Sequence, residues 1–196
     1  MKKVITLIVL FMIAILSFSC YKDCRIPGPY QFQLPVTLSP AKDTFHIGDT
    51  ISVASSFPEE LFELQTEEFF TLDDFKFYPK TYLIKWITQA DTTINDWSAL
   101  SEFDVLIDSI YPYDHFYFSS GNIALTGQFR HVNNTYDLKY QLIPKETGLY
   151  FFTQDSHLSR FTETQDFPGK CDGEETVFLI LFGDDDIGIV KAQILA

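Results

Sequence analysis

The chain has 196 residues, of which 46% are hydrophobic and 16% aromatic, so it is long enough for one domain with a substantial apolar core. Its 27 acidic residues outnumber the 14 basic ones, which gives a formal net charge of −13. This excess of negative charge argues against nucleic acid as a partner and against electrostatic binding to anionic lipid.

The N-terminus predicts a signal peptide over residues 1–19. Two lysines precede the uncharged apolar run Val4–Leu16, and the small residues Ser17 and Ser19 follow it, which is the order found in secretory signals. The run is shorter than the ~20 residues of a membrane-spanning helix, so cleavage is favoured over an uncleaved anchor. Cleavage by ordinary signal peptidase, which would release the protein from the membrane, stays open as an alternative.

Cys20 directly follows this segment, and the stretch around it resembles the lipobox of bacterial lipoproteins, in which the cysteine becomes the lipidated first residue. The stretch departs from the family pattern at Ser17, where Leu is preferred, and at Phe18, where a small residue is preferred. The resemblance implies an exported protein that is anchored by lipid at Cys20 in the bacterial cell envelope. We expect the outer membrane, with the periplasmic or surface face left open.

The count of cysteines supports lipidation. The chain has three, Cys20, Cys24 and Cys171, and an unpaired thiol is unfavourable in an oxidising compartment. If Cys20 carries lipid, Cys24 and Cys171 remain and can form a disulfide. The alternative is that both stay unpaired.

Residues 20–33 contain two prolines and a glycine and show no hydrophobic periodicity. They predict a lipid-anchored tether. The folded domain is expected over residues 34–196.

Within that domain, short segments of alternating apolar and polar residues predict β-strands separated by turns. Asn133 and Asn134 predict the turn of a hairpin. Strands at near-regular spacing indicate a mainly β fold, a single antiparallel β-sandwich. The strands are expected at 34–38, 50–56, 81–88, 103–107, 115–118, 123–132, 135–143, 148–153, 176–182 and 187–194.

The segment 58–80 departs from this alternation. Pro58, Glu59 and Glu60 follow two serines, and this combination of cap residues, first-turn proline and acids is typical of a helix start. A short helix to about Leu64 is therefore expected as an excursion from the sandwich.

Glu146, Gly148 and Tyr150 resemble the tyrosine corner of immunoglobulin-like domains, with Phe152 in place of the family's cysteine. The resemblance implies that the Tyr150 hydroxyl bonds back to the main chain a few residues upstream.

Gly48, Ile51 and Val53 likewise resemble strand B of immunoglobulin-like domains, with Ser55 in place of the first cysteine. The inter-sheet disulfide of that family therefore cannot form. The resemblance implies that Trp86 is the core tryptophan of strand C.

Chemistry-bearing motifs are scarce. The chain has no nucleophile elbow, phosphate-binding loop, dinucleotide fingerprint or HExxH sequence, so it is not expected to be an enzyme. The acidic run Asp184, Asp185 and Asp186 is a candidate Ca²⁺ site, with a solvated turn as the alternative. No other cofactor is expected.

Three aromatic residues are candidates for ligand binding. Trp97 lies in a polar segment, and Tyr111 and Tyr113 lie in a second aromatic loop. Flat aromatic rings stack on sugars, so this pattern favours a glycan as one class of ligand. The hypothesis is a non-enzymatic binding or assembly module of the cell envelope, whose partner is an unknown envelope protein or glycan. The alternative is a glycan-binding surface lipoprotein, accessory to a polysaccharide-uptake system.

Overall fold

The computed structural model describes residues 30–73, 75–89, 92–157, 176–182 and 189–196. These residues form strands and one short 3₁₀ helix, η1 (Ala99–Glu102). The strands are β1 (Tyr30–Ser39), β2 (Thr44–His46), β3 (Ile51–Pro58), β4 (Glu60–Glu63), β5 (Glu68–Thr71), β6 (Tyr78–Gln89), β7 (Thr92–Asp96), β8 (Phe103–Ile107), β9 (Tyr113–Tyr117), β10 (Ile123–Gly127), β11 (Arg130–Val132), β12 (Thr135–Pro144), β13 (Gly148–His157), β14 (Thr176–Phe182) and β15 (Ile189–Leu195).

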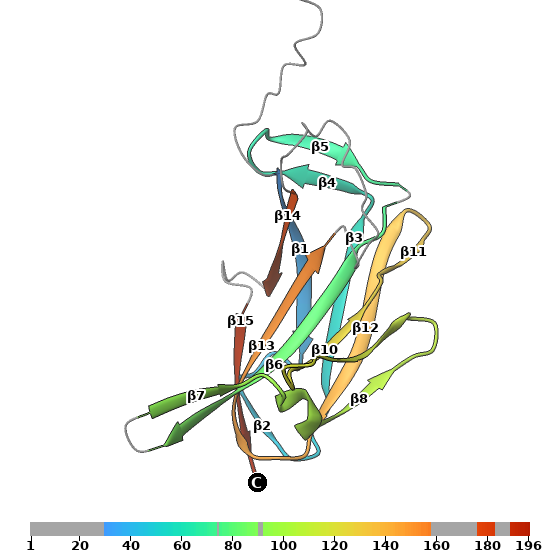
Figure 1. Cartoon of the computed structure of the whole chain (residues 1–196). Helices are drawn as coiled ribbons and strands as arrows, with labels where there is room; N and C mark the ends of the chain where they lie inside the picture. Colours follow the sequence, from blue (N-terminus) through green and yellow to red (C-terminus); the bar gives the residue numbers. More distant parts are fainter. Residues whose placement is uncertain (1–29, 74, 90–91, 158–175, 183–188) are drawn as a thin grey trace, which may run out of the picture.

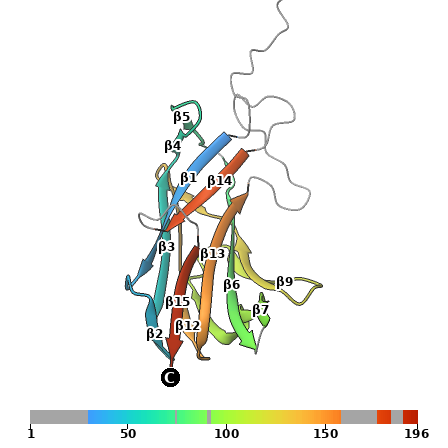
Figure 2. The same cartoon turned by 90° about the vertical axis from the view of Figure 1, so that its left-hand side faces the viewer.

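The strands form a β-sandwich of two layers (Figures 1 and 2). The large sheet has the order β9-β10-β6-β13, with β14 and β15 both beside β13 and with β7 beside β6. The small sheet has β12 at its centre, β3 on one side, and β11 and β8 on the other. The predicted mainly β, antiparallel sandwich is confirmed, although β1 with β14 and β2 with β15 pair in parallel.

The first strand belongs to both sheets. Residues Tyr30–Val36 pair with β14 of the large sheet, and Thr37–Ser39 pair with β3 of the small sheet. The strand therefore begins four residues before the expected domain start at Leu34, and residues 30–33 are not tether. Tyr30 and Phe32 are buried because the alternation of inward side chains continues upstream of Leu34.

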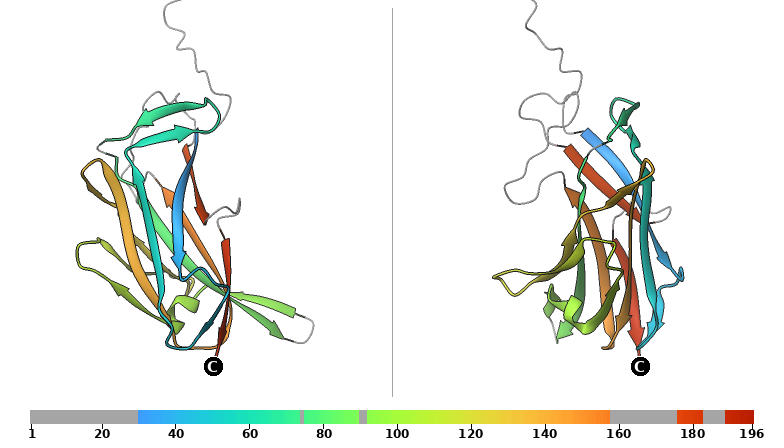
Figure 3. Two further views of the ribbon diagram at one scale, coloured as in Figure 1. Left: turned by 180° about the vertical axis from the view of Figure 1, so that it is seen from behind. Right: turned by 90° about the vertical axis from the view of Figure 1, so that its right-hand side faces the viewer.

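Segment 58–80 contains no helix in its described residues. Its first part is the β4–β5 hairpin, which lies across the end of the sandwich where β1 begins (Figure 3). The carboxylate of Glu63 accepts hydrogen bonds from the main-chain N–H groups of Gln31, Gln65 and Thr66, at 2.7, 3.0 and 2.6 Å. These bonds close the hairpin turn and join it to β1, so tertiary pairing overrides the local helix-start signal.

The predicted strand 123–132 is two strands, because the chain changes sheets within it. β10 pairs in the large sheet and β11 in the small sheet. At the crossing, the Phe129 N–H donates to the Phe77 carbonyl at 3.1 Å. The hairpin turn at Asn133 and Asn134 is confirmed, and both residues adopt the positive φ that such a turn requires, 52° and 60°.

The core between the sheets is rich in aromatic rings. Phe57, Phe77, Phe129 and Tyr136 form one group, with ring centroids 4.7 to 6.4 Å apart. The Tyr136 hydroxyl also donates to the Leu72 carbonyl at 2.7 Å. This bond ties the segment after β5 to the centre of the small sheet.

Candidate functional site

Tyr150 forms the tyrosine corner that its surrounding residues predicted. Its hydroxyl lies 3.2 Å from the Glu146 carbonyl and also bonds to the Glu102 carboxylate. Lys85 pairs with the same carboxylate at 2.6 Å. Burial, followed by the bond to Glu102, raises the pKa of the Tyr150 hydroxyl. This cluster fixes a corner of the sandwich.

The predicted ligand-binding aromatics lie in three different environments. Trp97 is 39% exposed, as its polar surroundings predicted. Tyr111 is half-buried and belongs to the small-sheet side, where its hydroxyl donates to Asp137 at 2.7 Å. Tyr113 is 4% exposed, with its hydroxyl 2.6 Å from the Thr81 hydroxyl, so it is a core residue and its prediction as a ligand contact is wrong.

Trp86 is not the core tryptophan that the resemblance implied, because it is 42% exposed. Leu83 packs in the core and marks the inward positions of β6, which also include Thr81 and Lys85. The strand alternates, so Tyr82, Ile84 and Trp86 point outward. The strand is apolar on both faces, and this is why the sequence could not show which face Trp86 occupies.

The outward side of the large sheet carries a set of aromatic side chains that we call the outer aromatic face. Cross-strand register places Phe151 of β13 opposite Ile84 of β6, and Phe116 of β9 opposite Ala124 of β10. The face comprises Tyr82, Trp86, Trp97, Phe116, Phe118 and Phe151.

Ring contacts divide this face into two groups. Tyr82 contacts Trp97 edge to face at 5.5 Å and Phe118 in a stacked geometry at 6.2 Å, and Phe118 contacts Phe116 at 4.8 Å. The second group is Trp86 with Phe151, at 5.3 Å. These contacts hold the rings in place while part of their surface stays exposed.

Two buried residues show how apolar this outward layer is. Ile84 is 9% exposed and Ala124 is 0% exposed, yet neither belongs to the core cluster between the sheets. By strand alternation they lie on the outward side of the sheet. An antiparallel sheet with one face on the core usually has a polar face toward water, and this outward layer departs from that pattern.

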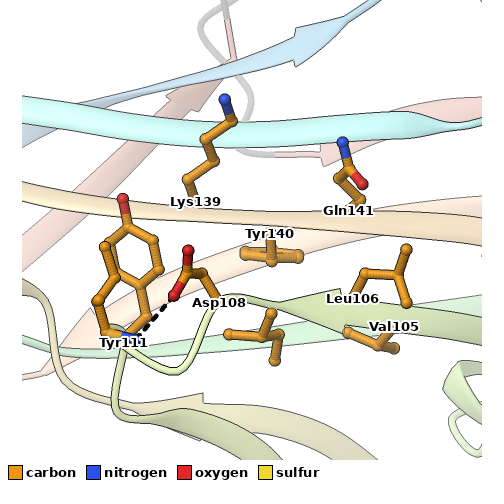
Figure 4. A pocket seen from close by; sticks show the side chains of 9 residues that line it. Val105, Leu106, Asp108, Tyr111, Lys139, Tyr140 and Gln141 are labelled. Carbon is orange, nitrogen blue, oxygen red and sulfur yellow. Dashed lines mark hydrogen bonds between the residues drawn. The ribbon is translucent and has the colours of Figure 1, made fainter.

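A separate groove of about 510 Å³ lies on the small-sheet side, between β12 and the end of β8 (Figure 4). Leu106 and Ile110 line it and are 52% and 50% exposed. Its hydrogen-bonding side chains are Asp108, Tyr111, Lys139 and Gln141, and Tyr140 contributes to its inner surface.

Beneath the groove lies a buried polar cluster that the sequence analysis missed. The Thr81 hydroxyl is 2.8 Å from the Tyr140 hydroxyl and 3.3 Å from Gln154 Oε1. Burial raises the pKa values of the hydroxyls of Tyr140 and, strongly, of Tyr113. The available signal was the placement of Thr81 and Gln154 at inward positions of apolar strands.

Several predicted sites lie outside the described residues: Cys20, the pair Cys24 and Cys171, and the acidic run 184–186. In the part of the chain that the structure describes, no three His, Cys, Asp or Glu residues are grouped as metal ligands. Over the same residues, no helix has the length and apolar character needed to span a membrane.

No family model matches the chain, and no curated protein sequence matches it. Among solved structures it is similar to the human F-spondin reeler domain, with a TM-score of 0.41 and 12% identity over 87% of this chain and 98% of that one. It is also similar to a non-cellulosomal cohesin from the archaeon Archaeoglobus fulgidus, with a TM-score of 0.34 and 10% identity over 86% and 93% of the two chains.

A third similar structure is that of AvmM, which catalyses macrocyclization in alchivemycin A biosynthesis. Its TM-score is 0.34, with 8% identity over 82% of this chain and 87% of that one. All three TM-scores lie below 0.5, and we draw no functional conclusion from them.

Proposed function

We propose that the protein is a non-enzymatic, lipid-anchored binding module of the bacterial cell envelope, and that it binds an envelope protein through the outer aromatic face. The observation that supports this proposal is the apolar layer on the outward side of the large sheet, with Trp86 and Trp97 left 42% and 39% exposed. Tryptophan and tyrosine are enriched among the residues that dominate the energy of protein interfaces.

The arrangement of the rings suits a preformed interface. Tyr82 is held between Trp97 and Phe118, so little side-chain freedom is lost when a partner covers them. Each aromatic side chain buries roughly 150–250 Å² when fully covered, so a few such rings supply a large part of a standard interface. The partner we expect is a protein with an apolar patch that lies flat on the sheet.

The proposed anchor is compatible with access to this face. Tyr30 lies at the end of the sandwich that carries the β4–β5 hairpin, and β7 lies at the opposite end (Figure 1). Lipid on Cys20 would therefore hold the hairpin end toward the membrane and leave the β7 end, near Trp86, away from it.

The anchor is tested by mass analysis of the mature N-terminus. Acyl groups on Cys20 are expected. A mature chain that begins at an unmodified Cys20, or at Tyr21, would refute the lipid anchor.

The binding surface is tested by cross-linking in intact envelopes followed by identification of the captured protein. We expect one dominant partner with the wild type and a loss of about tenfold or more with the double variant Trp86→Ser, Trp97→Ser. Val132→Ser, on β11 of the small sheet and 44% exposed, is the matched control and should retain capture. Equal capture by the double variant and the wild type would overturn the assignment of this face.

A second candidate function is glycan binding, as an accessory lipoprotein of a polysaccharide-uptake system. It is favoured by the half-exposed indole rings of Trp86 and Trp97, since such rings stack on sugars. A glycan array with wild type and Trp97→Ala tests it. Absence of binding to every glycan would exclude this candidate.

A further inference from the structure

The groove on the small-sheet side arises from a gap in strand pairing. The β8–β12 ladder ends where Ile107 lies opposite Tyr140, and the β11–β12 ladder begins where Arg130 lies opposite Asp137. On that side of β12, the pairing found in the described residues leaves out positions 138 and 139. The chain after β8 turns away here, and the groove forms in the space that remains.

One wall of the groove is held in position by three mutual contacts. The Tyr111 hydroxyl donates to Asp137 Oδ2 at 2.7 Å, and Arg130 donates to both oxygens of the same carboxylate at 3.1 Å. The Arg130 guanidinium also lies over the Tyr111 ring, 5.5 Å from its centroid. The ring is thereby fixed before any ligand arrives, which lowers the entropic cost of binding against it.

The other groups around the groove differ in chemistry. Leu106 and Ile110 supply exposed apolar surface, while Lys139, Gln141 and Asp108 supply donors and acceptors. Figure 4 shows Tyr111 and Leu106 at opposite ends of the groove, with Asp108 between them and with Lys139 and Gln141 along β12. Asp108 Oδ1 accepts a hydrogen bond from the Ile110 N–H at 3.1 Å, and both Asp108 and Lys139 are exposed and form no ion pair with each other in the described structure.

This combination restricts the class of ligand. A purely apolar ligand would desolvate the polar side chains of Asp108, Lys139 and Gln141 without replacing their hydrogen bonds to water, which is costly. A polyanion would meet Asp108 and the net charge of −13. A sugar ring fits both parts of the lining, because its C–H face is apolar and its hydroxyls both donate and accept. The volume of about 510 Å³ lies within the range of small-ligand sites.

We propose that this groove is a carbohydrate-binding site that takes a pyranose unit of an oligosaccharide. The ring packs against Tyr111 and Leu106, and its hydroxyls bond to Gln141, Asp108 and Lys139. This site is separate from the outer aromatic face, where we propose that a protein binds. If the second candidate function, glycan binding, is correct, the glycan would bind in the groove and not at Trp97.

The test is titration of the isotope-labelled protein, followed by two-dimensional NMR, with three named neutral probes: maltohexaose, cellohexaose and mannohexaose. Binding of at least one probe is expected, with shifts concentrated at residues 105–111 and 139–141. Gln141→Ala is expected to weaken that binding about tenfold, as for loss of one hydrogen bond to a desolvated group. Val132→Thr, outside the groove, should leave it unchanged.

Two further variants separate the possible outcomes. Tyr111→Phe keeps the aromatic ring that lines the groove and loses only the hydroxyl bond to Asp137, so it is expected to retain binding within a few-fold. Tyr111→Ala removes the ring and is expected to abolish binding.

Failure to bind any of the three probes would overturn the groove proposal. Binding that survives Gln141→Ala and Tyr111→Ala but is lost in Trp97→Ala would also overturn it, while leaving the second candidate function in place on the outer aromatic face. Cross-linking of the protein partner is expected to be the same in Gln141→Ala and the wild type, so the leading proposal is tested separately.

Discussion

The two outward faces of this sandwich have opposite character although they belong to the same domain. On the small sheet, cross-strand register places Ser56 opposite Asp137, and Ala54 opposite Lys139. These four side chains are small or polar, as expected for a sheet with one face on the core and the other in water, although Leu106 and Val132 of the same sheet are 52% and 44% exposed. On the large sheet, Trp86 and Phe151 occupy the equivalent outward positions and contact each other.

The difference separates the residues that build the core from those that lie only on the outer surface. Both inward faces supply the apolar surface that stabilises the fold. The aromatic rings on the large sheet lie outside this core, and we assign them to binding. Four predictions would break or sharpen this comparison.

The largest effect is expected at the inward positions, where the two sheets should behave alike. Leu125 of the large sheet and Leu138 of the small sheet are 0% and 1% exposed. Leu125→Ala and Leu138→Ala should each lower the free energy of unfolding by about 3 kcal/mol, because each leaves a cavity. Urea denaturation measures this. If one of the two variants lost less than about 1 kcal/mol of unfolding free energy and the other did not, the sheet that carries the less sensitive leucine would contribute less to the core.

The next effect concerns β1, the strand that joins the two sheets. Burial acts to raise the pKa of Glu63, but hydrogen bonds from Gln31, Thr66 and Gln65 outweigh it and lower the pKa below 4.5. The carboxylate therefore stabilises the fold above pH 4.5, and this stabilisation is lost as the pH falls through the lowered folded-state pKa. We expect Glu63→Gln to cost about 2 kcal/mol at pH 7.

Denaturation curves between pH 7 and pH 3 check the linkage at Glu63. The gap between wild type and Glu63→Gln should narrow as the solution becomes acidic. A gap independent of pH would show that the cost comes from altered packing and not from the charge.

A smaller effect is expected beside the polar face, at Tyr111. Tyr111→Phe removes the bond to Asp137 but leaves Arg130 paired with the same carboxylate, so the loss should be about 1 kcal/mol. The wild-type hydroxyl should titrate above its usual range, because burial, followed by the bond to Asp137, raises the pKa of Tyr111. The difference between the ultraviolet titration curves of the wild type and Tyr111→Phe gives the titration of the Tyr111 hydroxyl. A pKa of Tyr111 in the usual tyrosine range would contradict the bonded geometry.

The smallest effect on stability is expected on the outer aromatic face. Trp86→Ser should change the free energy of unfolding by less than about 1 kcal/mol, since the ring is 42% exposed, but it should clearly shorten retention on a hydrophobic interaction column. Val132→Ser, with 44% exposure on the small sheet, should shorten retention less. Equal shortening would mean that the two faces do not differ as described.

Much of the fold could be predicted from local patterns. Alternation placed most strands, Asn133 and Asn134 located the tightest hairpin turn, and the sequence around Tyr150 predicted the bond to Glu146. Each of these features depends on residues close together in the chain. Local patterns do not predict the structure where contacts between distant segments determine it. Glu63 is an example, because its bond to Gln31 on β1 stabilises a hairpin where the sequence favoured a helix.

The candidate sites were harder to predict for the same reason. Trp97 was correctly expected to be exposed. Trp86 was assigned to the wrong face of its strand, because apolar residues at successive positions do not reveal which face is inward. Tyr113 was expected in a loop, but it begins β9 and is buried. The groove at Tyr111 depends on the registers of two separate ladders on β12, neither of which can be derived from the residues that line it.

The crossing of β1 between the sheets has a mechanical consequence. Residues Tyr30–Val36 run parallel to β14 and the strand then continues antiparallel to β3. For a protein held by its N-terminus while a partner pulls on its body, the load enters along the axis of β1. Its hydrogen bonds on both sides are then strained together in shear, not opened one at a time, which is the geometry in which a short strand resists force best.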